Sequence, residues 1–149
     1  MKSKITMLII AFALTFSTSF ANDGHTEVPS AIHNNFSSHF VGAKNISWNK
    51  VGELYQANFE MDGSNLFAFF SSDAHFIGVM HHILSDRLPL LLQADLKINY
   101  QGYWITDLCE YAMHHEPGYR ITLENADQKI VLKSDNLSSW QLYETINKD

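Results

Sequence analysis

The spacing of apolar residues predicts a helix followed by strands, and it predicts this arrangement twice. In residues 28–42 and again in residues 88–102, a proline is followed by apolar side chains at every fourth position and then by a glycine. That spacing places the apolar side chains on one face of a helix. The two sets are Ile32, Phe36 and Phe40, and Leu92, Leu96 and Tyr100. Self-similarity at this distance indicates an internal repeat.

Each predicted helix is followed by segments in which apolar and polar residues alternate, as is typical of strands with one buried face. In the first repeat, Asp62-Gly63 is a strong signal for a two-residue hairpin turn. The register that follows pairs Met61 with Ser64, Phe59 with Leu66, Ala57 with Ala68, Tyr55 with Phe70, Asn58 with Phe67 and Gln56 with Phe69. One face of this hairpin is then consistently apolar, and a slip of one residue would destroy that pattern.

A second hairpin is predicted around Ala126-Asp127. Its register pairs Leu123 with Ile130, Ile121 with Leu132, and Glu124 with Lys129, the last being a favourable pair of opposite charges. The strand before it is expected to carry Tyr103, Ile105, Cys109, Tyr111 and Met113 on one side, and residues 114–118 are expected to form a turn. The sequence thus predicts an α+β fold of tandem α-β-β-β-β repeats, 28–84 and 85–149, that form one structural unit.

The first 21 residues have the pattern of a signal peptide. Lys2 and Lys4 precede an apolar run over residues 5–16, and Ser19-Phe20-Ala21 carries the small residues of a cleavage site. We expect cleavage near Ala21, a flexible lead-in over residues 22–27, and a periplasmic or secreted protein that is not inserted in the membrane. An uncleaved N-terminal anchor is the alternative, although the run is shorter than a membrane span of about 20 residues.

The charge of the chain narrows the class of partner. The 149 residues carry a formal net charge of −6, and no run of basic residues lies outside the leader. Nucleic acids and anionic membranes are bound through basic surfaces, so neither is an expected partner. The acidity itself is typical of a chain that stays in solution, and it would favour a partner with a basic surface.

The helix-to-strand passages resemble those of the PepSY-like proteins related to the beta-lactamase-inhibitor-protein (BLIP) fold, which are exported bacterial proteins. The residues that carry the resemblance are Val28-Pro29-Ser30-Ala31-Ile32, Gly42-Ala43-Lys44-Asn45-Ile46-Ser47-Trp48, Leu88-Pro89 and Tyr100-Gln101-Gly102-Tyr103. The resemblance covers residues 28–146. It implies a curved antiparallel sheet with the helices packed on one face and the other face available for recognition. It implies no catalytic residues and no cofactor.

Histidine and cysteine are the residue types that might carry chemistry. The chain has eight histidines, including the pairs His81-His82 and His114-His115, and imidazole is a common ligand of zinc, copper and nickel. Adjacent residues of a strand point to opposite faces, so a metal site would require both pairs to meet across the sheet. Cys109 is the only cysteine, and its alternating surroundings favour a buried, inert thiol over a reactive one. No catalytic motif is present, so we do not expect an enzyme.

The aromatic residues give the leading functional hypothesis. The predicted register sends Phe67 and Phe69 to the face away from the helix, beside the polar residues Gln56, Asn58 and Glu60. Exposed aromatic side chains on a rigid sheet are typical anchors for a partner. The alternative is that a loop or the next strand covers them. The sequence therefore predicts a non-enzymatic, exported binding module for a protein or peptide of the cell envelope, with a histidine-based metal-binding protein as the alternative.

Overall fold

A computed structural model describes residues 27–114 and 116–148 of the chain. The predicted leader, its cleavage site and most of the lead-in lie outside the described residues. The described elements are α1 (Ser30–His39), β1 (Lys44–Val51), β2 (Leu54–Met61), β3 (Ser64–Phe70), β4 (Phe76–His82), the 3-10 helix η1 (Ser85–Arg87), α2 (Leu90–Asn99), β5 (Trp104–Met113), β6 (Glu116–Glu124), β7 (Gln128–Ser134) and β8 (Gln141–Asn147). One helix followed by four strands therefore occurs twice, as expected.

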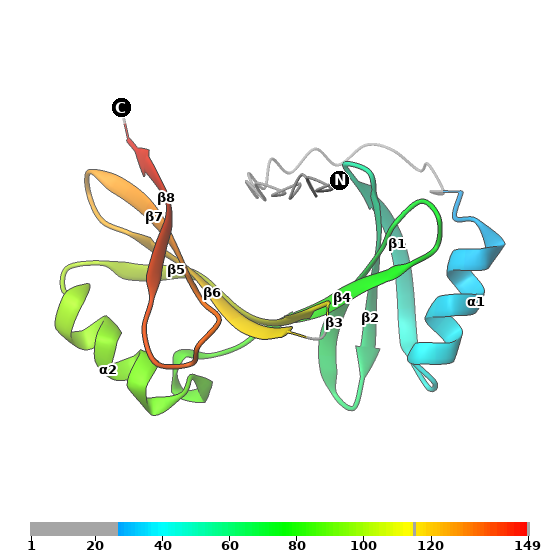
Figure 1. The fold of residues 1–149 in the computed structure, drawn as a ribbon, viewed down its shortest axis with the longest axis horizontal. Helices are drawn as coiled ribbons and strands as arrows, with labels where there is room; N and C mark the ends of the chain where they lie inside the picture. The colour runs from blue at the N-terminus through cyan, green and yellow to red at the C-terminus, as the bar shows by residue number, and fades with distance from the viewer. Residues whose placement is uncertain (1–26, 115, 149) are drawn as a thin grey trace, which may run out of the picture.

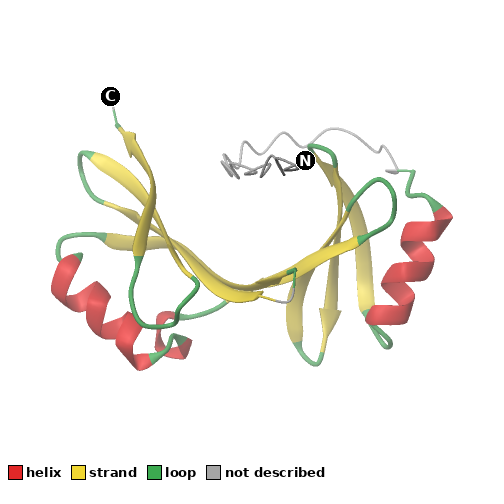
Figure 2. Cartoon of the chain, in the orientation of Figure 1, coloured by secondary structure: helices red, strands yellow, loops and turns green. Residues whose placement is uncertain are grey.

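The eight strands form one antiparallel sheet in which every strand pairs with its neighbours in the sequence, in the order β1 to β8. The two halves join where β4 pairs with β5. The sheet is curved, and both helices lie on its outer, convex side, one at each end (Figures 1 and 2). Among the described residues, no helix is long and apolar enough to cross a membrane.

Both predicted hairpin registers are confirmed. All six residue pairs expected between β2 and β3 are present, and so are the three expected between β6 and β7. Asp62 and Gly63 both have positive φ angles, 52° and 76°, which is the backbone that a tight two-residue hairpin turn requires. Glu124 and Lys129 form the expected ion pair, with their side-chain atoms 3.4 Å apart.

In the first half, the core between α1 and the sheet is largely aromatic. Phe36 of α1 contacts the rings of Phe59, Trp48 and Phe40, with centroids 5.0, 5.3 and 5.2 Å apart. The buried residues of this core are Ile32, Phe36, Ala57, Phe59, Ala68 and Phe70. The predicted apolar face of the first hairpin is thus the face that packs against the helix.

In the second half, the core beneath α2 is mostly aliphatic. Its buried residues are Leu88, Leu92, Leu108, Tyr119, Ile121, Leu123, Ile130, Leu132 and Trp140. Trp140 connects α2 to the segment before β8 by two hydrogen bonds. Its indole Nε1 donates to the carbonyl of Leu92 at 3.1 Å, and its backbone N–H donates to the carboxylate of Asp95 at 2.8 Å.

Two details of β5 and β6 differ from the sequence-based expectation. The pairing of β5 with β6 shifts between Ile105 and Asp107, so Ile105 lies opposite Leu123 and faces α2. Cys109, Tyr111 and Met113 face the other side, because a bulge changes which residues share a face. The turn expected over 114–118 is also shorter, since Glu116 to Gly118 already pair with Met113 to Tyr111.

Candidate binding face

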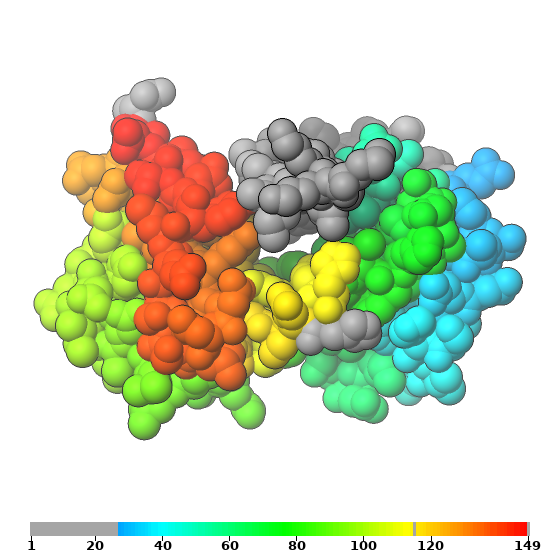
Figure 3. All heavy atoms as spheres, viewed as in Figure 1, coloured from blue at the N-terminus to red at the C-terminus, as the bar shows by residue number. Residues whose placement is uncertain are grey.

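The face of the sheet opposite the helices, which we call the concave face, is the candidate binding surface. The strands of both halves rise on either side of it, and β4, β5 and β6 form its floor (Figure 1). A space-filling view shows the same division into two lobes joined at the centre (Figure 3). The register places alternate residues of all eight strands on this face.

Polar side chains line the first-half part of the concave face. Gln56, Asn58 and Glu60 are all partly buried on β2 and point away from α1. The amide of Gln56 donates to the side-chain oxygen of Asn58 at 2.6 Å. Asn45, at the edge of the sheet, donates to the carboxylate of Glu60 at 3.0 Å. These side chains are therefore held in place before any partner arrives.

Phe67 lies on the predicted face and is partly exposed. It is opposite Met80 of β4, and its ring meets the ring of His82 edge-on at 5.6 Å. His82 in turn lies 3.1 Å from the carboxylate of Asp107. The ring thus lies between the strands β2 and β4, beside the apolar Met80 and the polar His82.

Phe69 also lies on the predicted face, but the expectation that it is exposed is wrong. Its exposed fraction is 3 %. On β4 it is opposite Gly78, which has no side chain, and the thioether of Met113 occupies the space over that glycine. Of the two predicted aromatic anchors, Phe67 is therefore the accessible one, and Phe69 is part of the packed floor.

The second-half part of the concave face carries cations. Arg120 of β6 and Lys133 of β7 are directly opposite each other, an arrangement that is unfavourable for like charges. The Lys133 ammonium lies 3.6 Å from the centre of the Tyr143 ring. Partial burial, helped by Arg120, lowers the pKa of Lys133. The charge of Asp135 acts on the pKa of Lys133 in the opposite direction.

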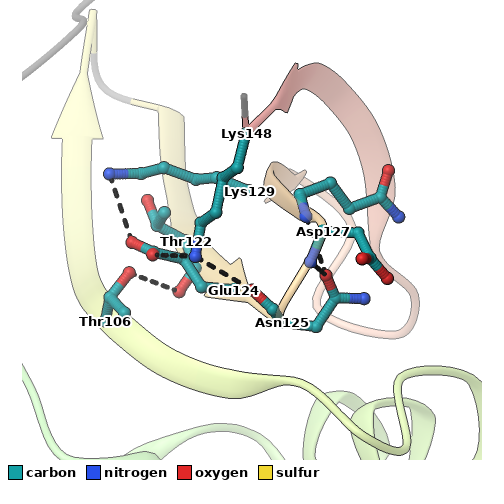
Figure 4. A network of polar contacts seen from close by, with 8 residues as sticks. Thr106, Thr122, Glu124, Asn125, Asp127, Lys129 and Lys148 are labelled. Atoms are coloured by element: carbon teal, nitrogen blue, oxygen red, sulfur yellow. Dashed lines mark hydrogen bonds and ion pairs between the residues drawn. The ribbon is translucent and has the colours of Figure 1, made fainter.

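Farther along the second half, a polar network closes the end of the β6–β7 hairpin (Figure 4). The carboxylate of Glu124 forms a second ion pair in addition to the one with Lys129. The ammonium of Lys148 lies 2.9 Å from it. Lys148 also donates to the carbonyl of Asn125 at 2.9 Å and lies over the ring of Trp104. The lysine contacts, chiefly Lys148, lower the pKa of the Glu124 carboxyl. This network links the end of β8 to the hairpin.

Cys109 does not have the properties of a nucleophile. Its exposed fraction is 2 %, and burial raises its pKa to about 11. The reactive form of cysteine is the thiolate, so this thiol is unreactive near neutral pH. Burial also raises the pKa of the neighbouring Tyr111, whose hydroxyl donates to Asp135 at 2.7 Å. The expectation of a buried thiol is confirmed.

The described histidines do not converge. His81 and His82 pair with Glu110 and Cys109 near one end of the β4–β5 ladder, whereas His114 follows the other end. The nitrogen atoms of His81 and His82 lie 3.6 and 3.1 Å from carboxylate oxygens of Glu110 and Asp107. Residues 27–114 and 116–148 contain no group of three or more His, Cys, Asp or Glu side chains placed to hold a metal ion.

The cations of the second half were not among the residues predicted to bind a partner. The signal was present, because extending the predicted register by one pair beyond Ile121 and Leu132 places Arg120 opposite Lys133. The contact of Lys133 with Tyr143 could not be foreseen, since the pairing of β7 with β8 shifts between Val131 and Leu132. A bulge of this kind leaves no clear mark in the alternation of residues.

Comparisons with known proteins find similarity in structure alone. No protein-family model and no curated protein matches the sequence. A BLIP-like protein from Bacteroides fragilis superimposes with a TM-score of 0.70 at 18 % identity, covering 83 % of this chain and 89 % of that one. A DUF2874 family protein from Bacteroides uniformis gives a TM-score of 0.71 at 13 % identity, with 81 % and 90 % covered.

A protein predicted to be periplasmic, from Bacteroides eggerthii, has a TM-score of 0.69 at 15 % identity and covers 81 % of this chain and 89 % of its own. All three similarities extend over most of both chains. At these identities they establish a common architecture and leave the site residues to be argued from this chain. The protein has the BLIP-like fold.

Proposed function

We propose that the protein is an exported, non-enzymatic binding module that recognises a protein or peptide through the concave face of its sheet. The observation that carries the proposal is that both helices lie on the convex side, which leaves the other face to strands alone (Figure 2). The site comprises Phe67 as the accessible anchor, Gln56, Asn58 and Glu60 beside it, and Phe69 as the support beneath it.

The part of the concave face around Phe67 suits a protein or peptide partner. An aromatic ring and fixed amide groups there offer apolar contact and hydrogen bonds, which are common features of binding hot spots. We infer that the partner presents an apolar side chain beside polar groups on one exposed segment. Inhibition of an envelope enzyme is one form that such binding could take.

We also propose that the two halves are copies of one PepSY-like unit, 28–84 and 85–149, and that a signal peptide cleaved near Ala21 delivers the protein to the periplasm or the exterior. The identical order of elements and the matching hairpin registers support the duplication. The predicted periplasmic location of the Bacteroides eggerthii protein supports the export.

The test of the binding proposal is capture from envelope extract of the producing cells. Immobilised wild-type protein is compared with the variant Phe67→Ser, and the retained proteins are identified by mass spectrometry. Phe67 is chosen alone because Phe69 is buried, so that a change at Phe69 would also disturb packing. We expect the Phe67→Ser variant to capture at least tenfold less partner than the wild type, while its unfolding midpoint stays near that of the wild type.

A matched control is Leu142→Ser. Leu142 is an exposed apolar residue of β8 that is paired with Leu132, a residue of the core beneath α2. The Leu142→Ser variant should capture the same partner as the wild type, and as much of it. Equal capture by Phe67→Ser and Leu142→Ser would refute the assignment of the concave face.

The alternative of a metal-binding protein has no support from the described residues. Equilibrium dialysis with zinc, copper and nickel separates the two functions. Stoichiometric binding at micromolar free metal, abolished by replacing His81 and His82, would favour the alternative. Its absence together with partner capture would favour the binding module.

A further inference from the structure

A hollow in the second half lies between the C-terminal end of α2 and the start of β5. Its volume is about 430 Å³, within the range of sites for small molecules. It is lined by Leu96, Lys97, Tyr100, Gln101, Gly102, Tyr103, Ile105 and Leu123. The hollow lies beside the helix, and Leu123 and Ile105 face it from the side of the sheet that packs on α2. It is therefore on the opposite side of the sheet from the concave face.

The corresponding place in the first half is filled by aromatic rings. Phe36 and Phe40 of the first repeat correspond to Leu96 and Tyr100 in the spacing of the two helices. The ring of Phe40 packs at a tilt against two other rings. Its centroid lies 4.7 Å from that of Phe59 and 5.2 Å from that of Phe36. In the second half, Leu96 and Leu123 are smaller than these rings, and Tyr100 has one ring contact among the described residues, with Tyr103 at 6.4 Å. The C-terminal ends of the two helices are thus packed differently, against aromatic rings in the first half and beside a hollow in the second.

The chemistry of the hollow is apolar with a single cation. Lys97 is exposed in the last turn of α2, and no acidic side chain is among the lining residues. The nearest acid on that turn, Asp95, accepts hydrogen bonds from the backbone of Trp140 and from Asn99. In a chain with a net charge of −6, a lone lysine at the rim of an apolar hollow favours a ligand with an anionic head.

Some of the polar groups around the hollow take part in hydrogen bonds within the protein. The hydroxyl of Tyr103 accepts from Gln128, and the amide of Gln101 donates to the carbonyl of Lys97. The carbonyl of Leu96 accepts from the backbone of Tyr100. A peptide would bury several amide groups against the apolar side chains of Leu96, Ile105 and Leu123, where an amide that finds no hydrogen-bond partner is costly. An unbranched hydrocarbon chain has no such groups.

We propose that this hollow binds an unbranched aliphatic carboxylate, with the hydrocarbon chain on Leu96, Ile105 and Leu123 and the carboxylate at Lys97. The site is independent of the partner surface on the concave face.

The test is equilibrium dialysis of octanoate, decanoate and decanol against the protein as purified from producing cells, below the concentrations at which these compounds form micelles. Each additional methylene buried should tighten binding about fourfold, so decanoate should bind about fifteen times more tightly than octanoate. Decanol has the same chain without the charge, and we expect it to bind about fivefold more weakly than decanoate.

Three variants locate the ligand. Leu96→Phe introduces the ring that the first half has at Phe36, and it should weaken decanoate binding at least tenfold without lowering the unfolding midpoint. Lys97→Gln should weaken decanoate to the affinity of decanol, whereas Lys44→Gln removes the same charge from the other half and should change nothing. Phe67→Ser, which alters the concave face, should leave decanoate binding unchanged.

Several results would overturn the proposal. Unchanged binding by Leu96→Phe would show that the ligand lies elsewhere, and equal affinity for decanol and decanoate would remove the role of Lys97. Tighter binding of acetyl-leucyl-leucine than of decanoate would indicate a peptide terminus instead. Loss of decanoate binding in Phe67→Ser would place the ligand on the concave face, whereas loss of partner capture alone would concern the proposed function.

Discussion

The two halves of the molecule have the same order of elements and fill their cores in opposite ways. At matching positions of the two hairpins, the first half has alanine where the second has a large aliphatic residue, and phenylalanine where the second has serine. The matching pairs are Ala57 and Ile121, Ala68 and Leu132, and Phe70 and Ser134, all of them buried. The alanines make room for the ring of Phe36, which the helix inserts from above.

A core is therefore specified by the total volume that its elements supply together, and less by the residue at any one position. In the first half the helix supplies rings and the sheet supplies small residues. In the second half the sheet supplies volume and the helix supplies leucines. At the end of α2, the sheet does not fully make up for the smaller side chains of the helix, and the hollow described above remains.

The outer faces of the helices differ in the same direction. The outer face of α1 is formed by asparagine, serine and histidine, whereas α2 exposes Leu90, Leu91 and Ile98 by 79, 61 and 70 %. Nothing among the described residues covers these three side chains. The first half is therefore closed and polar on its convex side, and the second half is more apolar.

The largest expected effect comes from removing the ring that has no counterpart in the second half. Phe70 is fully buried and contacts Phe36, Trp48 and Phe76, with centroids 6.3, 6.0 and 5.5 Å apart. Phe70→Ala should lower the free energy of unfolding by about 3–5 kcal/mol, because it leaves a cavity in a packed core. Unfolding by urea, followed by circular dichroism, measures this.

The control for Phe70→Ala is the matching change in the other half. Ser134 is 1 % exposed, and its hydroxyl makes one long hydrogen bond, 3.5 Å to Asn136. Ser134→Ala should cost less than about 1 kcal/mol. Comparable losses from the two substitutions would contradict the view that the halves place their core volume differently.

A smaller effect is expected at two glycines near the junction of the halves. A Cβ atom on Gly78 would lie 2.9 Å from the Cα of Met113 and would also meet the carbonyl of Ala112, so backbone has to move. A Cβ atom on Gly118 would lie 2.6 Å from the ring of Tyr111, which is a side chain and can turn. We expect Gly78→Ala to cost about 1–3 kcal/mol and Gly118→Ala less.

Thermal unfolding of the two glycine variants measures the difference directly. The ring of Tyr111 can turn away from position 118 if it gives up its hydrogen bond to Asp135. The double variant Tyr111→Ala with Gly118→Ala should therefore show no further loss relative to Tyr111→Ala alone. A larger shift of the midpoint for Gly118→Ala than for Gly78→Ala would mean that the ring is held more firmly than the backbone.

The smallest effect is a difference in alkaline stability between the halves. Burial raises the pKa of Cys109 to about 11, and burial together with carboxylate partners raises the pKa values of Tyr111 and Tyr119. All three groups lie in the second half, and each is more easily ionised in the unfolded chain. The stability that Cys109 contributes is therefore present below about pH 9 and is lost as the pH rises towards 11.

Tryptophan fluorescence can follow the two halves separately, since Trp48 packs on α1 and Trp140 on α2. In variants that retain one of these tryptophans, the signal of Trp140 should change at a lower alkaline pH than the signal of Trp48. Trp48 changing first would contradict the assignment of the titrating groups to the second half.

Local patterns in the sequence predicted much of the fold. The Asp62-Gly63 turn and the alternation around it were sufficient for the β2–β3 register, because a two-residue loop leaves one pairing that keeps the apolar side chains together. The helix starts at Pro29 and Pro89 were also predictable, since proline suits the first turn of a helix. The face on which Phe67 lies followed from that register.

Features that depend on distant neighbours could not be predicted. The shift at Ile105 to Asp107 depends on how β5 meets β6, and alternation in one strand does not record it. The buried Phe69 lies opposite Gly78, and Met113 lies over that glycine; Gly78 and Met113 are distant in sequence and meet only when β4 pairs with β5. Predicting the hollow beside α2 would require knowing how far the side chains of Leu96 and Leu123 extend. Each is a matter of side-chain volume in three dimensions.

The pairing of every strand with its sequence neighbours also bears on how the protein folds. Most contacts in such a sheet join residues that are close along the chain, so few long loops have to close before strands meet. When the chain emerges N-terminus first, each new strand finds the strand that it pairs with already in place. The sheet can therefore grow by one strand at a time from either hairpin, and the second half can be added to a first half that has already folded.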